Sequence, residues 1–316
     1  MGNAKKRSGS VASMLPVLLA CSFTASFGQS MMNVALPELA ERFGVTLSIA
    51  NWVIVGYMVV AATAIMLSAF MLRRLGLRRV FFVGAGALAL GSACALLSQD
   101  FPMLFASRLV QAVGTGLFFP SVTSVIMTNS PAAVRGTRLA LNSGVIAVGL
   151  AISPTASGFA LTQFGWRAMF VVSLAMSVAL LAVGFFRIHG GPSTKRVPID
   201  ALSVMLGPLG LAAFLYGLGE VTRDLAPSLA ALAVGAVLLA LFAWRQCALE
   251  SPLLDLHPLV HPRFAVGILL VMVGMLTSFS MSILLPLYYE GALGRTAFFA
   301  GLLLLGPVLV NAAFTF

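Results

Sequence analysis

The chain has 316 residues, of which 60% are hydrophobic and only 9% are charged, and its mean hydropathy is +1.03. A water-soluble domain needs more charge than this to cover its surface, so the composition excludes a soluble globular protein. The net charge of +10 does not indicate nucleic-acid binding, because no basic stripe lies on a soluble domain.

Apolar runs of about twenty residues recur along the chain, and each can cross roughly 30 Å of hydrocarbon as a helix. A membrane β-barrel would instead show short segments of alternating hydropathy, so we expect an all-α polytopic membrane protein with about ten transmembrane helices. The predicted spans cover residues 14–36, 49–71, 80–98, 102–127, 139–161, 168–186, 201–219, 227–244, 264–287 and 297–316.

The distribution of basic residues predicts the orientation of these spans. Successive loops lie on opposite sides of the membrane. The N-terminal tail and the loops on its side carry fourteen basic residues: Lys5, Lys6, Arg7, Arg73, Arg74, Arg78, Arg79, Arg135, Arg138, Arg187, Lys195, Arg196, Arg245 and Arg263. The other side receives four: Arg42, Arg167, Arg223 and Arg295. Because cytoplasmic loops carry the excess of Lys and Arg, we expect a cytoplasmic N-terminus in the cell membrane.

Polar interruptions divide the chain into units of six, two and two spans. We predict a cytoplasmic tail, a six-helix bundle, a cytoplasmic linker, two linking spans, a cytoplasmic loop and a last pair of helices. In that order these units cover residues 1–13, 14–186, 187–200, 201–244, 245–263 and 264–316. The last apolar run stops without a polar tail, which we interpret as a truncated ending.

Two predicted helices carry polar side chains at helical spacing inside the membrane. The first span has such a stripe at Ser22, Ser26, Gln29 and Asn33, and the fourth has one at Arg108, Gln111 and Thr115. A charged side chain near mid-span costs about 2.5–3.5 kcal/mol on insertion scales. The two polar neighbours Gln111 and Thr115 favour an Arg108 that faces a cavity, whereas hydrogen bonds that pack one helix on another are the better interpretation of the serines.

The fifth span carries small residues every four positions, at Gly149, Ser153 and Ser157. Such a ladder lets another helix approach closely, and Pro154 removes a backbone donor and bends the helix. A bent, closely packed helix suits a gate, although close packing alone is an equally fair interpretation.

Motifs of enzymes and of metal or cofactor sites are absent from the sequence. There is no HExxH, no Gly-rich phosphate loop with a lysine, and no serine–histidine pair within a span. The three cysteines form no pattern, and the three histidines fall in predicted cytoplasmic segments. We therefore predict neither an enzyme nor a protein with a bound metal or cofactor.

Several motifs in order resemble the major facilitator superfamily, and within it the fourteen-span drug–proton antiporter family. "SMMNVALP" (30–37) is similar to that family's first-helix motif, and "RLVQAVGTG" (108–116) to the fourth-helix motif Arg-x-x-Gln-Gly-x-Gly. "GLAISPTASG" (149–158) is similar to the antiporter motif of the fifth helix, ending at Gly158. "FGWRAMF" (164–170) fits the start of the sixth helix.

The resemblance implies two six-helix bundles around a central substrate, with two extra spans between them, of which this chain supplies only part of the second bundle. It implies a cavity lined by Gln29, Asn33, Tyr57, Arg108, Gln111, Thr115, Phe119 and Tyr216. It gives gating or packing roles to Gly76, Arg78, Gly149, Ser153, Pro154, Ser157 and Gly158. Arg108 would bond to the first span through Gln29 or Asn33.

Two acids usual in that family are missing, because Gly28 and Arg73 occupy their positions. Arg108 cannot exchange protons, because an arginine guanidinium stays protonated in proteins. The remaining candidates for coupling, besides a fixed charge at Arg108, are Glu220 and Glu290 at the outer ends of their spans.

The resemblance implies a secondary transporter, a proton-coupled exporter of drugs or other amphipathic compounds, with the lipid bilayer and protons as further partners. The missing acids favour a second hypothesis, a transporter without proton coupling. The third is a truncated fragment that does not transport. Sequence beyond Phe316 separates the third hypothesis from the others, and dependence of transport on a pH gradient separates the first from the second.

Overall fold

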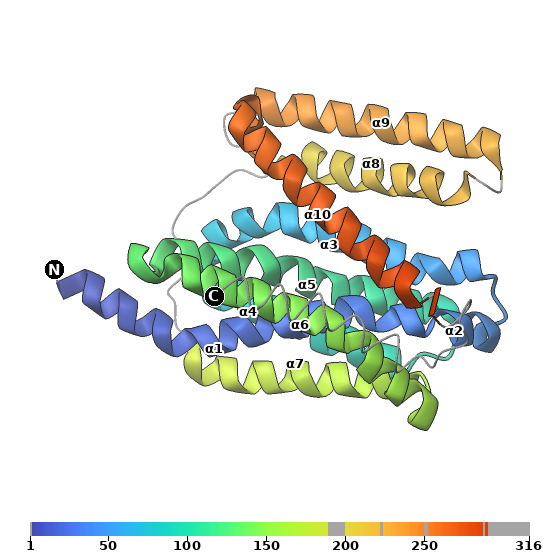
Figure 1. The fold of residues 1–316 in the computed structure, drawn as a ribbon, viewed down its shortest axis with the longest axis horizontal. Helices are drawn as coiled ribbons and strands as arrows, with labels where there is room; N and C mark the ends of the chain where they lie inside the picture. Colours follow the sequence, from blue (N-terminus) through green and yellow to red (C-terminus); the bar gives the residue numbers. More distant parts are fainter. Residues whose placement is uncertain (1, 189–199, 222–223, 250–251, 287, 290–316) are drawn as a thin grey trace.

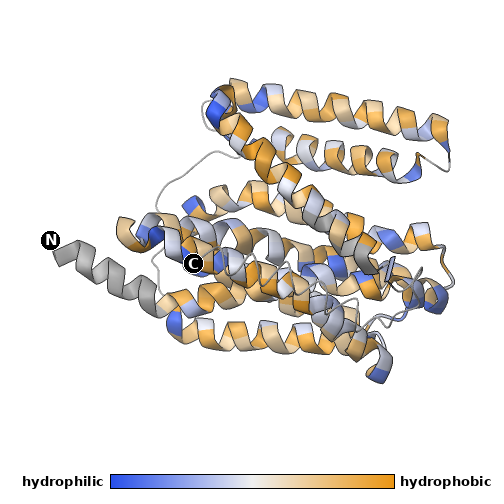
Figure 2. Ribbon diagram, in the orientation of Figure 1, coloured by the Kyte–Doolittle hydropathy of each residue, from blue (hydrophilic) through white to orange (hydrophobic). Residues whose placement is uncertain are grey.

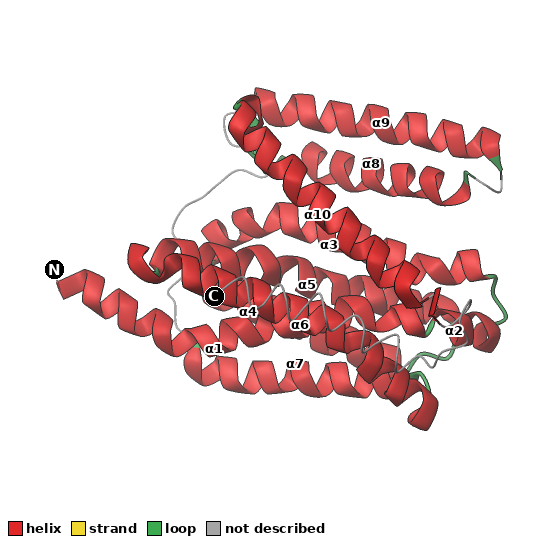
Figure 3. Ribbon diagram, viewed as in Figure 1, coloured by secondary structure: helices red, strands yellow, loops and turns green. Residues whose placement is uncertain are grey.

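The computed structural model describes residues 2–188, 200–221, 224–249, 252–286 and 288–289. Over these residues its regular structure is helical throughout, without a strand, as Figure 3 shows. Eight helices in this part of the chain are long and apolar enough to cross a membrane. The predicted all-α polytopic architecture is confirmed.

Six long helices pack together as the first bundle (Figure 1). They are α1 (Gly2–Ser30), α3 (Leu47–Leu75), α4 (Leu77–Leu96), α5 (Phe101–Asn129), α6 (Ala132–Phe164) and α7 (Arg167–Arg187). A short 3₁₀ helix η1 (Met31–Val34) and helix α2 (Leu36–Phe43) connect α1 to α3. Helix α5 is central, because it contacts α1, α3, α4 and α6.

The sequence around α5 explains where that helix begins. The Asp100 carboxylate accepts a hydrogen bond from the Met103 amide at 2.8 Å, which satisfies one of the free N–H groups at the helix N-terminus. Pro102 in the first turn needs no such partner, because proline has no amide hydrogen. This start sets the register that turns Arg108 and Gln111 into the bundle.

A tight connection joins α3 to α4 through one residue, Gly76. Its φ of +79° lies in the region that favours glycine, and its amide donates to the Leu72 carbonyl at the end of α3. The following helix therefore starts at once and returns antiparallel to α3.

Helices α8 (Ala201–Glu220) and α9 (Leu225–Ala248) form a hairpin that packs on α3, outside the bundle (Figure 1). Close approach within the hairpin depends on glycines: a Cβ at Gly235 would lie 2.5 Å from the Phe214 backbone nitrogen. Where α8 meets α3, the rings of Tyr216 and Trp52 stack with centroids 5.9 Å apart.

The chain continues through a 3₁₀ helix η2 (His257–Val260) into α10 (Pro262–Pro286), which runs diagonally across the view of Figure 1. Apolar side chains of α10 are exposed, including Leu270 and Leu276. Hydrophobic residues also predominate along the other helices, as the orange segments of Figure 2 show, and many of their large apolar side chains are exposed. Such surfaces belong in a lipid bilayer, where apolar exposure costs nothing.

The helices differ in extent from the predicted spans. The first predicted span is divided, because α1 starts at Gly2 and ends at Ser30, before η1 and α2. Helix α6 begins at Ala132, so Arg135 and Arg138 are helical rather than in a loop, and α9 continues to Ala248. Hydropathy marks only the lipid-buried part of a helix, whereas hydrogen bonding carries the helix beyond it. Residues 189–199 of the predicted linker and the tenth span, 297–316, lie outside the described residues.

Candidate functional site

Arg108 lies in the interior of the first bundle, two turns into α5. Its side chain has 0% solvent exposure and is the largest fully buried side chain of the described residues. Burial of a permanently charged group is costly unless polar groups surround it, so its neighbours decide what it can do.

One terminal nitrogen of the guanidinium makes two hydrogen bonds. Nη1 of Arg108 donates to the Gly28 carbonyl oxygen of α1 at 3.1 Å and to Gln111 Oε1 at 2.6 Å. The second bond joins side chains three residues apart on α5, as the helical spacing requires. Arg108 thus links α5 to α1 through backbone rather than through a side chain.

Gln111 extends this network to two further helices. Its Nε2 donates to Ser92 Oγ of α4 at 2.7 Å, and Ser92 Oγ lies 3.0 Å from Ser173 Oγ of α7. Helix α4 can approach α5 this closely because residue 91 is glycine: a Cβ there would lie 2.5 Å from Gln111 Cγ. A buried polar chain therefore connects α1, α5, α4 and α7.

Tyr57 of α3 completes the enclosure. The Arg108 Cζ lies 4.1 Å from the centroid of the Tyr57 ring, a distance at which the π face attracts a cation. Its hydroxyl is 2.6 Å from Thr115 Oγ1 of α5, so the ring is held in place. Tyr57 and Thr115 are both buried.

Two nitrogens of the same guanidinium, Nε and Nη2, are buried and have no hydrogen-bond partner. An unsatisfied buried donor costs about 1–3 kcal/mol, and more when it is charged. The seven carboxylates of the described residues lie at helix ends, in the short helix α2 or in connections: Glu38, Glu41, Asp100, Asp200, Glu220, Asp224 and Asp255. Within the described part of the chain, no acid inside a spanning helix balances the charge of Arg108.

The predicted bonds from Arg108 to Gln29 or Asn33 are wrong, because the partner on α1 is the Gly28 carbonyl. Helix α1 ends at Ser30, and the 3₁₀ turn that follows leaves Asn33 exposed. Gln29 is half-buried beside the partner residue. Backbone acceptors of this kind leave no trace in a side-chain pattern.

Of the other predicted cavity residues, only some belong to the buried network around Arg108. Thr115 belongs to it through the hydrogen bond with Tyr57, whereas Phe119 is half-buried against the hydrophobic core that contains Phe118. Tyr216 lies apart, on α8 against α3, with its ring on Trp52.

The predicted gating residues fall into two groups, of which the first is the α3–α4 connection. There, Gly76 makes the turn described above, and Arg78 lies over the rings of Phe82 and Phe185, each with its centroid 6.0 Å from Cζ. Arg73, at one of the usual acid positions, lies in the last turn of α3, and its Nε donates to the Ala69 carbonyl.

The second group is the contact between α1 and α6. Gly149 faces Ser26, since a Cβ at position 149 would lie 2.0 Å from Ser26 Oγ. Ser153 Oγ donates to the Phe27 carbonyl at 2.7 Å, one residue before the carbonyl that binds Arg108. Ser157 is buried, whereas a Cβ at Gly158 would meet only Val34, at 3.7 Å. Pro154 lies within α6, which continues through it as one helix.

Of the coupling candidates, Glu220 is the last residue of α8, at the end of a hairpin outside the bundle, and Glu290 lies outside the described residues. Ser92 and Ser173 were not singled out by the sequence pattern. Their only signal is a polar residue in an apolar span, and serines satisfy that condition at many positions without a network.

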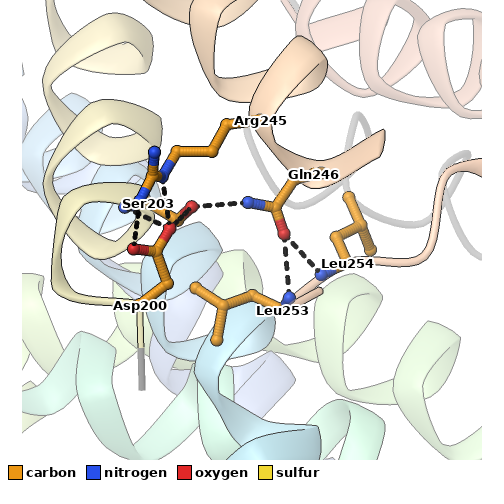
Figure 4. Close-up of polar contacts among 6 residues, drawn as sticks. All are labelled: Asp200, Ser203, Arg245, Gln246, Leu253 and Leu254. Atoms are coloured by element: carbon orange, nitrogen blue, oxygen red, sulfur yellow. Dashed lines mark hydrogen bonds and ion pairs between the residues drawn. The ribbon is translucent and has the colours of Figure 1, made fainter. Parts of the chain in front are cut away.

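A second polar cluster joins the ends of α8 and α9 (Figure 4). Asp200, the N-cap of α8, accepts hydrogen bonds from Arg245 Nε at 2.7 Å and Nη2 at 2.8 Å. The Ser203 hydroxyl donates to the same carboxylate. The bonds from Arg245 and then Ser203 hold the pKa of Asp200 well below its usual range.

Gln246 connects this cluster to the chain that follows α9. Its Nε2 donates to Ser203 Oγ at 2.6 Å, and its Oε1 accepts from the amides of Leu253 and Leu254 at 2.8 and 3.1 Å (Figure 4). Gln246 is fully buried, although the sequence placed it in a cytoplasmic loop. The cluster fixes where the chain leaves the hairpin.

Comparison with protein families identifies the whole arrangement. The family model described as Major Facilitator Superfamily matches residues 18–316. The chain belongs to this superfamily. As a member of the major facilitator superfamily, it is a multi-pass protein of the cell membrane, and it shares its fold with transport proteins rather than enzymes.

Curated relatives of this superfamily member include proteins named for drug resistance. It is 32% identical to the lincomycin resistance protein LmrB of Bacillus subtilis over 303 residues, which cover 94% of the chain and 63% of the relative. It is 30% identical to the uncharacterized MFS-type transporter YhcA of the same organism, covering 94% and 57%. The multidrug export protein EmrB of Escherichia coli is 27% identical, covering 92% and 57%. The chain therefore spans about 60% of the length of these relatives.

Solved structures agree on the fold of the superfamily. The proton:xylose symporter XylE bound to 6-bromo-6-deoxy-D-glucose has a TM-score of 0.56 and 17% identity, covering 98% of this chain and 68% of its own. The peptide transporter POT in complex with alafosfalin has a TM-score of 0.54 and 17% identity, covering 93% and 56%. At this identity the likeness concerns the fold alone.

Proposed function

We propose that the complete protein is a secondary transporter that exports amphipathic compounds, including drugs, across the cell membrane in exchange for protons. Membership of the superfamily supports transport as the activity. The names of relatives at 27–32% identity, which refer to lincomycin resistance and multidrug export, support export of such compounds.

The observation that carries the proposal is the buried network around Arg108. A charged side chain inside a membrane bundle is retained at a cost, and it marks a substrate or ion pathway by default. This one contacts α1 and the ring on α3, and it connects through Gln111 to α4 and α7. A group that joins several helices can respond when the bundle rocks during alternating access.

The fixed charge of Arg108 has a defined task in this proposal. Because the guanidinium stays protonated, it does not carry the proton itself. It acts instead on neighbouring groups, biasing the binding of anionic partners and the orientation of Tyr57. The aromatic ring of Tyr57 and the half-buried Phe119 supply apolar surface suited to amphipathic ligands.

A second candidate is a transporter of the same compounds without proton coupling. The observation in its favour is the absence of a carboxylate from the interior of the spanning helices that the structure describes. Glu220 ends a helix outside the bundle, where it is poorly placed to sense occupancy near Arg108.

Export of a fluorescent amphipathic dye from everted vesicles tests the proposal. The complete protein should concentrate dye inside such vesicles when their lumen is acidified, and a protonophore should abolish the accumulation. Arg108→Gln should lower the rate at least about tenfold, as expected when a charged hydrogen-bonding group is removed. Protein-dependent dye entry that only equilibrates across the membrane and ignores the protonophore would favour the second candidate, and no protein-dependent dye movement at all would contradict both.

A further inference from the structure

The unpartnered nitrogens of Arg108 define a vacant binding edge. Nε and Nη2 point to the same side of the planar guanidinium, where their N–H bonds run nearly parallel. This edge matches the two oxygens of a carboxylate, which it binds through two parallel hydrogen bonds. The opposite terminal nitrogen, Nη1, is already occupied by Gly28 and Gln111. The molecule thus holds the guanidinium by one nitrogen and leaves its bidentate edge unused.

Nothing in the described part of the chain balances this charge. The surrounding groups are a backbone carbonyl, an amide oxygen and an aromatic face, and all of them are neutral. These neutral groups reduce the free-energy cost of burying the cation but do not neutralise its charge. An anion at the free edge would therefore be attracted more strongly than an anion beside an arginine at the protein surface.

Position 28 leaves space next to this cation. A Cβ on Gly28 would meet only one atom within 4 Å, the Tyr57 hydroxyl oxygen at 4.0 Å. The other buried glycines within the helices of the bundle leave no such space: a Cβ at Gly114, for example, would lie 2.5 Å from the Gly84 carbonyl oxygen. Gly28 also contacts Arg108 through its carbonyl, and Arg108 lies over Tyr57. The space therefore adjoins the two residues that hold the guanidinium.

We propose that the substrate of this protein carries a carboxylate and that the Nε–Nη2 edge of Arg108 binds it. The inference rests on the proposed function, because it names the chemical class of the exported compound: an amphipathic acid. Tyr57 would pack against the apolar part next to the acid, while Gln111 keeps the guanidinium in its orientation. Arg108 has 0% exposure in the present conformation, so the acid enters when the enclosing helices separate.

A pair of dyes that differ in one carboxyl group tests the inference. Rhodamine B has a free carboxyl group, and its ethyl ester has the same ring system without the negative charge. Binding to the purified complete protein in lipid nanodiscs is measured by fluorescence polarisation, and transport in everted vesicles. We expect the acid to bind about ten- to a hundredfold more tightly than the ester, and Arg108→Gln to abolish this preference.

A second pair of variants keeps the test decisive if Arg108→Gln does not fold. Gly28→Asp supplies a carboxylate from the protein itself, which would compete for the edge of Arg108 and remove the preference for the acid. Gly28→Asn adds nearly the same volume without the charge, so this variant should still bind the acid more tightly than the ester. The difference between the two variants therefore isolates the charge.

The possible results distinguish a failure of the carboxylate site from a failure of the proposed export function. Equal binding of acid and ester by the wild-type protein, with transport of both, would overturn the carboxylate site and leave the exporter intact. A preference for the acid that survives both Arg108→Gln and Gly28→Asp would also overturn it. Folded protein that neither binds nor moves either dye would overturn the proposed export of amphipathic compounds and this inference together.

Discussion

The neighbours of the buried Arg108 guanidinium have different roles. Gln111 and the Gly28 carbonyl hold one nitrogen of the guanidinium, whereas the Tyr57 ring covers its face. A cation–π contact is worth about 2 kcal/mol or more when it is shielded from water. The ring and the hydroxyl of Tyr57 should therefore contribute separately to stability.

Substitution of Tyr57 separates these two contributions. Tyr57→Phe keeps the ring under Arg108 and loses the bond to Thr115, so it should lower the stability by about 1 kcal/mol. Tyr57→Leu loses the ring as well and should cost at least about 2 kcal/mol more. Thermal unfolding of the purified protein measures both. Equal losses for the two variants would mean that the ring does not stabilise the guanidinium.

At the scale of the elements, the α8–α9 hairpin is closed at one end by the ion pair between Asp200 and Arg245 (Figure 4). The same carboxylate caps α8, because its Oδ2 also accepts from the Ser203 amide at 3.3 Å. The pKa of Asp200 lies below its usual range, so the folded protein favours the charged form. A group with a depressed pKa stabilises the fold above its unfolded pKa, about 3.9, and that contribution is lost as the pH falls below this value.

Asp200→Asn should therefore destabilise the protein at pH 7, and the difference from wild type should shrink on acidification below about pH 4. Asparagine remains a good N-cap, so the variant removes the charge and the ion pair but keeps the cap. Thermal unfolding across this pH range provides the measurement. If the difference in stability instead grew on acidification, the charged form of Asp200 would not stabilise the fold, which would contradict the ion pair with Arg245.

At the scale of the whole molecule, the sequence predicted the membrane architecture well, because lipid demands long apolar helices and leaves few alternatives. Arg108, Gln111 and Thr115 were recognisable as a group, since all three lie on one helix and follow its period. The contacts between helices were not recognisable. The Gly28 carbonyl is backbone, and Ser92 and Ser173 resemble many other serines until the packing brings them to Gln111.

The ends of the elements were also beyond a hydropathy pattern. Gln246 was placed in a polar loop, yet α9 extends past it, and its amide is buried against Ser203 and the Leu253 amide. Its burial depends on Ser203, 43 residues away, which no local window contains, and on the backbone amide of Leu253, which a hydropathy pattern does not record. Likewise, the division of the first span into α1, η1 and α2 moved Asn33 away from Arg108.

Within the described residues, Arg108 holds an unbalanced charge, and there is space beside it at Gly28. The most direct measurement is the thermal stability of Gly28→Asp against Gly28→Asn, each made with and without Arg108→Gln. If the charge is unbalanced, Gly28→Asp unfolds several degrees above Gly28→Asn, because its carboxylate pairs with the guanidinium, and this advantage disappears when Arg108 is replaced. Equal melting temperatures for the two variants, or a less stable Gly28→Asp, would contradict it.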